Sequence, residues 1–159
     1  MNASPVIEHG SFGSSRSSSA VVLVIEDSDE DYEALERFFR KEATQIRLMR
    51  QPTGNSALIY LQECLQTEDR SRVSLPSLIL LDLNLPGIDG RAVLRSIKQN
   101  PQLVQIPIVV LTTSNNPRDV LECYQLGANS YLVKELDVAL FNASIKTLVE
   151  YWFNAILLP

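Results

Sequence analysis

Five short runs of aliphatic residues alternate along the chain with longer segments in which apolar residues recur every three or four positions. A short continuous apolar run bounded by turn residues is typical of a strand buried on both faces, whereas the wider spacing is typical of an amphipathic helix. The alternation therefore predicts an α/β fold, a doubly wound parallel sheet with helices on both faces. The expected strands are residues 21–25, 46–49, 78–81, 108–111 and 130–133.

Capping residues mark several ends of the five expected helices. Ser28 stands before three acidic residues, which are favoured at the positive end of a helix dipole. Pro117 is expected to begin the fourth helix and Gly127 to close it. The last helix is the longest and is expected from about residue 137 to residue 157.

Composition along the chain suggests the domain organisation. Residues 1–20 are rich in Ser and Gly and have little to bury, so we expect a disordered tail. Residues 21–150 hold all the strand and helix patterns and are expected to form one domain. Residues 151–159 extend the last helix with aromatic and aliphatic side chains.

Overall composition narrows the class of protein. The chain has 159 residues, 45% of them hydrophobic, and a formal net charge of -5, which argues against a nucleic-acid or anionic-membrane surface. Cys64 and Cys123 lie in apolar helical patterns without metal-binding spacing, so we expect free buried thiols in a reducing compartment. No apolar run is long enough to span a membrane, and the N-terminus lacks the centre of a signal peptide. We therefore expect a cytoplasmic protein.

Polar residues follow four of the five predicted strands. Taken singly, each has an ordinary explanation, such as the start of a helix, a capped turn, a strand end or a solvated lysine. In a parallel sheet, however, the carboxyl ends of all strands lie along one edge, so these side chains are expected to converge. They are Glu26, Asp27, Asp82, Thr112 and Lys134.

The converging side chains suggest a particular chemistry. Clustered carboxylates repel one another, and oxygen ligands without His or Cys select a hard cation such as Mg2+. A carboxylate nucleophile, a Mg2+ ion and a lysine are the groups needed to accept a phosphoryl group, because that transfer depends on positioning and charge neutralisation. The sequence therefore predicts a phosphate-handling site around Asp82, with Lys134 as a second cation and Thr112 as a hydroxyl donor.

The chain resembles the receiver domain of two-component response regulators over residues 21–149. The resemblance rests on the acidic pair after the first strand, the segment Asp-Leu-Asn-Leu-Pro-Gly-Ile-Asp-Gly at residues 82–90, Thr112, and Tyr-Leu-Val-Lys at residues 131–134. It implies a flavodoxin-like fold with strand order 2-1-3-4-5. It also implies that a histidine kinase phosphorylates Asp82 and that the protein signals by protein contact, without turnover of a separate substrate.

Further roles are implied by the resemblance alone. Lys134 would contact the phosphate. Thr112 and Tyr131 would form a switch in which the hydroxyl moves to the phosphate and the aromatic ring turns inward. The Mg2+ ligands would be Glu26, Asp27, Asp82 and the main-chain carbonyl of Asn84.

One departure from the family pattern concerns the loop after the fifth strand. The family usually places proline after the lysine, often through a cis bond, whereas Glu135 follows Lys134 here. A cis bond without proline costs about 3 kcal/mol. We therefore expect either a trans bond in a rearranged loop or a strained cis bond.

The end of the chain carries more apolar area than its fold requires. Large apolar side chains beyond the inward stripe of the last helix predict a partner surface, unless the extension folds back on its own domain. The ending resembles that of small response regulators of phytochrome-type histidine kinases, several of which form homodimers. The residues of this expected surface are Tyr151, Trp152, Phe153, Leu157 and Leu158.

The output is expected to be contact with another protein. We expect no DNA-binding effector after the receiver pattern, because it would need tens more residues and a basic face. The expected partners are the sensor kinase, a downstream target or a histidine phosphotransfer protein, and a second copy of the chain.

Two other classes of protein fit part of the pattern. A hydrolase of the haloacid-dehalogenase type also places an aspartate after a buried strand, but it requires a second acid two residues later, where this chain has Asn84. A receiver-like scaffold that never takes phosphate would not need all the polar residues at the strand ends.

Overall fold

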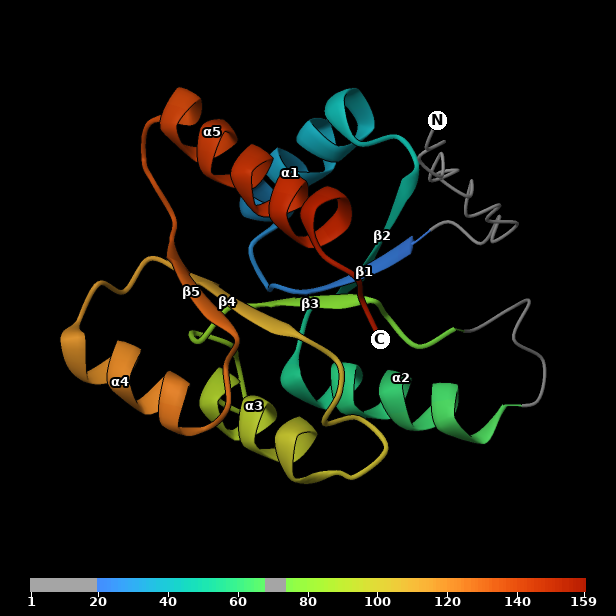
Figure 1. Cartoon of the computed structure of the whole chain (residues 1–159). Coiled ribbons are helices and arrows are strands. Elements are labelled where there is room, and N and C mark those ends of the chain that lie inside the picture. The colour runs from blue at the N-terminus through green and yellow to red at the C-terminus, as the bar shows by residue number, and fades with distance from the viewer. Residues whose placement is uncertain (1–19, 68–73) are drawn as a thin grey trace, which may run out of the picture.

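A five-stranded parallel sheet lies between two layers of helices in the computed structural model, which describes residues 20–67 and 74–159 (Figure 1). The strand order is β2-β1-β3-β4-β5, and all four neighbouring pairs are parallel. The predicted α/β class and strand order are therefore confirmed. The strands are β1 (Ala20–Ile25), β2 (Ile46–Gln51), β3 (Leu78–Leu81), β4 (Ile108–Thr112) and β5 (Ser130–Val133).

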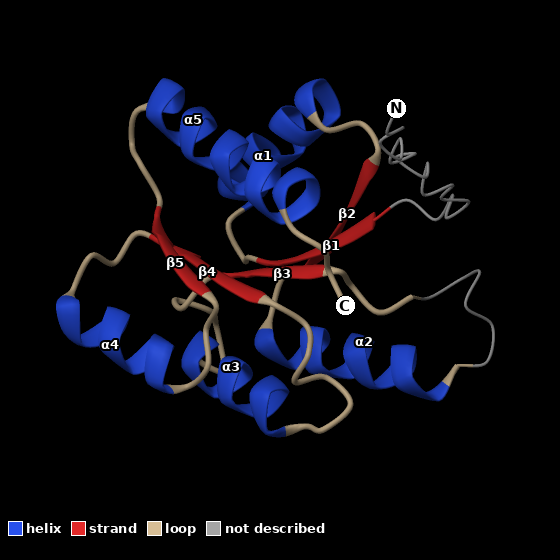
Figure 2. Cartoon of the chain, viewed as in Figure 1, coloured by secondary structure: helices blue, strands red, loops and turns tan. Residues whose placement is uncertain are grey.

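The helices cover both faces of the sheet, with α1 (Asp29–Glu42) and α5 (Val138–Val149) together on one face. Figure 2 shows the remaining helices on the opposite face. These are α2 (Gly54–Gln66), α3 (Gly90–Gln99) and α4 (Pro117–Gln125). Their ends follow local chemistry: the Ser28 side chain accepts a hydrogen bond from Asp31 N–H at the start of α1, and Gly127 after α4 has a φ of 99°.

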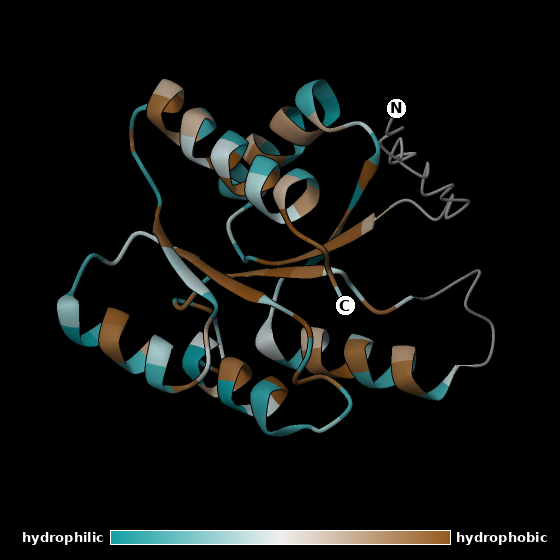
Figure 3. Cartoon of the chain, in the orientation of Figure 1, coloured by the Kyte–Doolittle hydropathy of each residue, from teal (hydrophilic) through white to brown (hydrophobic). Residues whose placement is uncertain are grey.

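Two hydrophobic cores form because successive strand residues point to opposite faces. Leu23 and Ile25 of β1 pack toward α2 and α3, whereas Val22 and Val24 pack toward α1 and α5. The central strands are accordingly apolar along most of their length (Figure 3). The central strands β1, β3 and β4 are buried on both faces, whereas the edge strands β2 and β5 are mostly half-buried. The polar residues that follow the central strands therefore have defined positions.

Several element boundaries differ from the expectation, among them the end of β4, which includes Thr112. Ala20, expected in the tail, is the first residue of β1, and β2 continues through Arg50 and Gln51. The last helix does not stay α-helical to residue 157, because a π-helix (Glu150–Ala155) follows α5 and the chain is extended at Ile156. The expected disorder of the N-terminal tail concerns residues that, apart from Ala20, lie outside the described part of the chain.

Both cysteines, Cys64 and Cys123, are buried and free, as expected. Among the described residues, no helix has the length and apolar character to cross a membrane.

Candidate functional site

The register of the sheet brings the polar residues at the strand ends together. Ile25 of β1 lies beside Leu81 of β3, so the residues that follow them, Glu26 and Asp82, are neighbours across two strands. Asp82 N–H donates to the Ile25 carbonyl at 3.0 Å, which continues the pairing by one step. On the other side, Thr112 pairs with Val133, and Lys134 N–H donates to the Thr112 carbonyl at 2.8 Å.

Three carboxylates form a compact cluster at this edge. Glu26, Asp27 and Asp82 each offer an oxygen, and these oxygens lie within 4.8 Å of one another. Glu26 and Asp82 are only 2% and 7% exposed, whereas Asp27 faces solvent. An all-oxygen donor set of this size, open on one side, fits a hard divalent cation that keeps some of its water.

The Lys134 ammonium lies in the middle of these acids. Its Nζ atom is 2.5 Å from Oε2 of Glu26, 3.0 Å from Oδ2 of Asp82 and 2.7 Å from Oδ2 of Asp31. The last contact was not expected from the sequence. Lys134 thus connects the ends of β1, β3 and β5 and the first turn of α1, and it brings positive charge to the Asp82 carboxylate.

Burial shifts the pKa values of Glu26 and Lys134, which form a buried ion pair, in opposite directions. It raises the pKa of the Glu26 carboxyl, and the hydrogen bond and charge of Lys134 counteract only part of that effect. Burial alone would lower the pKa of Lys134, but hydrogen bonds with Asp31 and Glu26 and the charge of Asp82 outweigh it, so the pKa lies above its ordinary value. The lysine is therefore positively charged at neutral pH.

The loop after β3 fixes the direction of Asp82. Asn84 N–H donates to Oδ1 of Asp82 at 3.2 Å, and Gly90 N–H at the start of α3 donates to the Leu83 carbonyl at 2.9 Å. A Cβ atom at Gly90 would lie 2.2 Å from the Asp82 carbonyl oxygen, so only glycine permits this close approach. The glycine therefore lets α3 begin directly against the backbone of the acidic residue.

Thr112 and Tyr131 lie on adjacent strands but do not contact each other through their hydroxyl groups. Thr112 is fully buried, and its Oγ1 atom has no hydrogen-bond partner among the described residues. The Tyr131 hydroxyl donates to the Ser114 carbonyl at 2.9 Å, and its half-buried ring packs against the core. A buried hydroxyl without a partner is costly, which makes Thr112 a donor in need of an acceptor.

The loop after β5 has the simpler of the two expected conformations. No peptide bond within residues 20–67 and 74–159 is cis, so the bond between Lys134 and Glu135 is trans. The trans loop still delivers the lysine ammonium to Asp82.

The apolar residues at the end of the chain divide into buried and exposed groups. Trp152 is 9% exposed and belongs to the core beneath α5, and Phe153 and Leu158 pack against that core from outside. Tyr151 and Leu157 are 53% and 98% exposed. Of the five residues of the expected surface, only Tyr151 and Leu157 present large apolar areas outward in a single copy of the chain.

Comparison with known proteins agrees with this geometry. Residues 22–146 match the family model of the response regulator receiver domain, and the chain belongs to that family. It is 39% identical to the response regulator Rcp1 of Synechocystis sp. over 139 residues, which cover 87% of this chain and 92% of Rcp1.

Solved structures of such regulators have the same fold. The Mn2+-bound form of Rcp1 superposes with a TM-score of 0.78 at 38% identity, covering 88% of this chain and 99% of that one. The phosphorylated cyanobacterial phytochrome response regulator RcpA gives a TM-score of 0.80 at 33% identity, covering 89% and 99%. The predicted flavodoxin-like receiver fold is confirmed, and the chain is a response regulator with a phosphoacceptor role in two-component signalling.

Proposed function

We propose that Asp82 is the residue that accepts the phosphoryl group. The observation that carries this proposal is the position of its carboxylate, 3.0 Å from the Lys134 ammonium and in one cluster with Glu26 and Asp27. One oxygen of Asp82 is held by Asn84 N–H, so the carboxylate has a fixed direction. Its small remaining exposure lets a donor approach from the open edge of the sheet.

The proposed reaction is a transfer from a phosphohistidine. A carboxylate oxygen of Asp82 forms a bond to phosphorus while the bond from phosphorus to the imidazole nitrogen breaks, and the electron pair stays on that nitrogen. Lys134 neutralises charge on the phosphoryl oxygens, and the Thr112 hydroxyl donates to one of them. Hydrolysis of the acyl phosphate returns the free carboxylate, and we propose no turnover of any other substrate.

We propose Mg2+ as the cation of the site. Its ligands would be Glu26, Asp27, Asp82 and the carbonyl of Asn84. Bound there, the ion would supply further positive charge to the phosphoryl oxygens. The chemistry of the donor set supports a hard divalent ion, and the Mn2+-bound form of Rcp1 is a relative that holds one.

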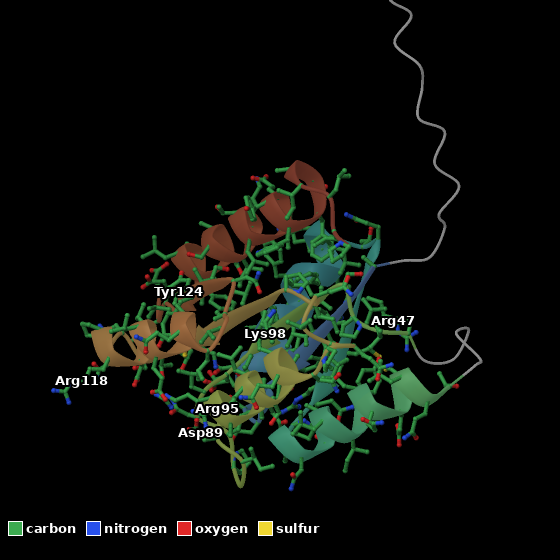
Figure 4. All side chains as sticks on the ribbon, turned by 60° about the horizontal axis from the view of Figure 1, so that its bottom comes forward. Arg47, Asp89, Arg95, Lys98, Arg118 and Tyr124 are labelled. Carbon is green, nitrogen blue, oxygen red and sulfur yellow. The ribbon has the colours of Figure 1, made fainter. Side chains whose placement is uncertain are left out.

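We also propose that Thr112 and Tyr131 transmit phosphorylation to α4. A phosphoryl group on Asp82 would give the Thr112 hydroxyl an acceptor, and the resulting shift at the end of β4 would move the Ser114 carbonyl that holds Tyr131. The exposed face of α4 carries Leu121 and Tyr124, which are 60% and 48% exposed. Tyr124 and Arg118 of this helix are labelled in Figure 4.

Phosphorylation by acetyl phosphate tests the assignment of Asp82. We expect labelling of the wild-type chain that requires Mg2+ and is abolished by a chelator and by Asp82→Asn. Asp89→Asn is the matched control, because Asp89 is an exposed carboxylate of the same loop whose capping role Asn retains. Equal labelling of the wild type and Asp82→Asn would exclude Asp82 as the acceptor.

We propose a phytochrome-type histidine kinase as the phosphodonor, acting in the cytoplasm, with a histidine phosphotransfer protein as a further partner. The support is similarity to RcpA, which is described as a phytochrome response regulator. Phosphotransfer from a phosphorylated phytochrome-type kinase should be much faster than from unrelated histidine kinases. Equal rates would contradict the proposed preference.

We propose that the end of the chain supports a homodimer. Tyr151 and Leu157 supply exposed apolar area for such an interface. Phe153 and Leu158 adjoin this area, whereas Trp152 is buried in the core and would support the interface from beneath. Sedimentation equilibrium should give a dimer for the wild type and a monomer for Leu157→Glu.

A second exposed leucine provides the control for dimerisation. Leu136 is 97% exposed and precedes α5, so Leu136→Glu should remain dimeric. A monomeric wild type at high concentration would overturn the dimer proposal.

A further inference from the structure

Arg50 binds the acidic loop from the neighbouring strand. It lies near the end of β2, where its register partner is Val24 of β1. Its Nε atom donates to the Glu26 carbonyl at 3.0 Å, and its Nη2 atom donates to the Asp27 carbonyl at 3.0 Å. The planar guanidinium thus holds two consecutive carbonyls of the loop that carries the metal-binding acids.

Two further contacts hold the Arg50 side chain itself. Its Nη1 atom lies 2.7 Å from Oδ1 of Asp29, at the first residue of α1. Its guanidinium carbon lies 5.0 Å from the centre of the Tyr32 ring, within the range of a cation–π contact. The side chain is 23% exposed, and Arg50 therefore joins the end of β2, the acidic loop and α1.

The two acids of the loop differ in how their carboxylates are held. The Glu26 carboxylate accepts from Ser28 N–H and from Lys134. Within the described part of the chain, no hydrogen-bond donor holds the Asp27 carboxylate, so only the position of its backbone limits where its oxygens can lie. Arg50 fixes that backbone through the Asp27 carbonyl.

We propose that Arg50 is a positioning residue of the divalent-cation site, acting through the backbone of Asp27. Arg50 does not touch the cation. It holds the Asp27 backbone where the carboxylate can reach the Asp82 cluster before the ion arrives, so the ion does not have to order the loop. This inference rests on the proposed metal ligands, and it adds a residue from β2 that is outside the ligand set.

The first measurement is Mn2+ affinity, followed by the loss of the free-ion signal in electron paramagnetic resonance. Arg50→Lys keeps the charge but cannot bind both carbonyls in a fork. We expect its Mn2+ affinity to fall by about tenfold, as is usual when a group that orients a metal ligand is removed. Unfolding followed by Trp152 fluorescence checks that the variant is folded under the conditions of the titration.

Arg47 provides the matched control on the same strand. Its side chain is exposed, its one side-chain hydrogen bond among the described residues goes from Nη2 to Met49 Sδ, and it is labelled at the β2 edge of the sheet in Figure 4. Arg47→Lys should change Mn2+ affinity by less than about twofold. A loss in Arg47→Lys as large as that in Arg50→Lys would overturn the proposal, because the loss would then not depend on the contacts that Arg50 makes with the acidic loop.

A double-mutant cycle distinguishes positioning from general damage. If Arg50 acts through Asp27, Arg50→Lys should cost little additional affinity in an Asp27→Asn background. An additive loss, or an Arg50→Lys affinity within about twofold of the wild type, would overturn the role of Arg50 and leave the proposed ligands intact. Failure of the wild type to bind Mn2+ would instead remove the proposed metal site, and this inference with it.

Discussion

The Oδ2 atom of Asp31 lies 2.7 Å from Nζ of Lys134, although the two residues are 103 positions apart in the chain. Asp31 belongs to the first turn of α1, and Lys134 follows β5. The hydrogen bond with Asp31 is the foremost of the interactions that raise the pKa of this buried lysine. The acid of α1 therefore helps to hold a positive charge beside Asp82.

Asp31→Asn should lower the pKa of Lys134, because an amide cannot stabilise the ammonium as a carboxylate does. The titration is followed by the Lys134 side-chain signals in NMR. Glu30→Gln is the control: Glu30 is an exposed acid of the same helical turn, and no ion pair joins it to Lys134 among the described residues. If the pKa of Lys134 is unchanged in Asp31→Asn, Glu26 and Asp82 are sufficient to keep the lysine charged.

Gly90→Ala should destabilise the fold by at least about 3 kcal/mol, because the new Cβ would lie 2.2 Å from the Asp82 carbonyl oxygen and 2.6 Å from Leu83 Cα. These are backbone atoms and cannot move aside as a flexible side chain could. Denaturant unfolding measures the change in free energy. Gly87→Ala is the comparison, since Gly87 has a φ of 77° but no atom near its Cβ position. Gly87→Ala should lower the free energy of unfolding by only about 1 kcal/mol. Equal destabilisation by Gly87→Ala and Gly90→Ala would contradict the steric explanation.

The interior of the sheet could be predicted because its central strands, β1, β3 and β4, are buried on both faces. Such strands must be apolar throughout, so their ends are visible where the first polar residue appears, as at Glu26 and Asp82. The convergence of these ends then follows from the parallel arrangement. The positions of Lys134 and Thr112 at the same edge follow for the same reason.

The contributions of Asp31 and Arg50 could not be predicted in this way. The acidic first turn of α1 is sufficiently explained by the helix dipole, and sequence does not reveal how far the Lys134 side chain reaches. Arg50 was missed because β2 is an edge strand, which can continue through polar residues after its apolar run ends at Met49. Similarly, apolar spacing over six residues does not separate an α-helix from the π-helix at Glu150–Ala155.

Asp119 should lose its contribution to stability in acid. Hydrogen bonds from the Ser114 hydroxyl at 2.6 Å and from Arg91 at 2.6 Å hold the pKa of its carboxyl below the usual value. A group whose pKa is depressed by folding stabilises the fold above its unfolded pKa, and the effect disappears as pH falls through the folded value. The stability difference between the wild type and Asp119→Asn should therefore shrink below about pH 4.

Urea unfolding of both proteins from pH 7 to pH 3 measures this difference. The Ser114 carbonyl accepts a hydrogen bond from the Tyr131 hydroxyl, so Asp119→Asn should also broaden or shift the Tyr131 ring signals in NMR at neutral pH. A stability difference that is constant with pH would show that the Asp119 contacts do not depend on its charge.

Thr112→Val should stabilise the unphosphorylated protein and abolish its response to phosphate. Thr112 Oγ1 is fully buried without a hydrogen-bond partner among the described residues, and valine replaces the hydroxyl with a methyl group of similar size. Removing an unpaired buried hydroxyl should gain about 1 kcal/mol in denaturant unfolding. The variant should still bind beryllofluoride at Asp82 but should no longer shift the Tyr131 signals when it does.

Thr113→Val is the control for Thr112→Val, because the adjacent Thr113 is exposed and its hydroxyl is solvated. It should be close to neutral in stability and should keep the shift of Tyr131. A destabilised Thr112→Val would mean that the hydroxyl already has a partner in solution. If Thr112→Val is more stable but its Tyr131 signals still shift with beryllofluoride, the unpaired hydroxyl is not needed for the switch. The end of β4 would then respond to phosphorylation through its backbone alone.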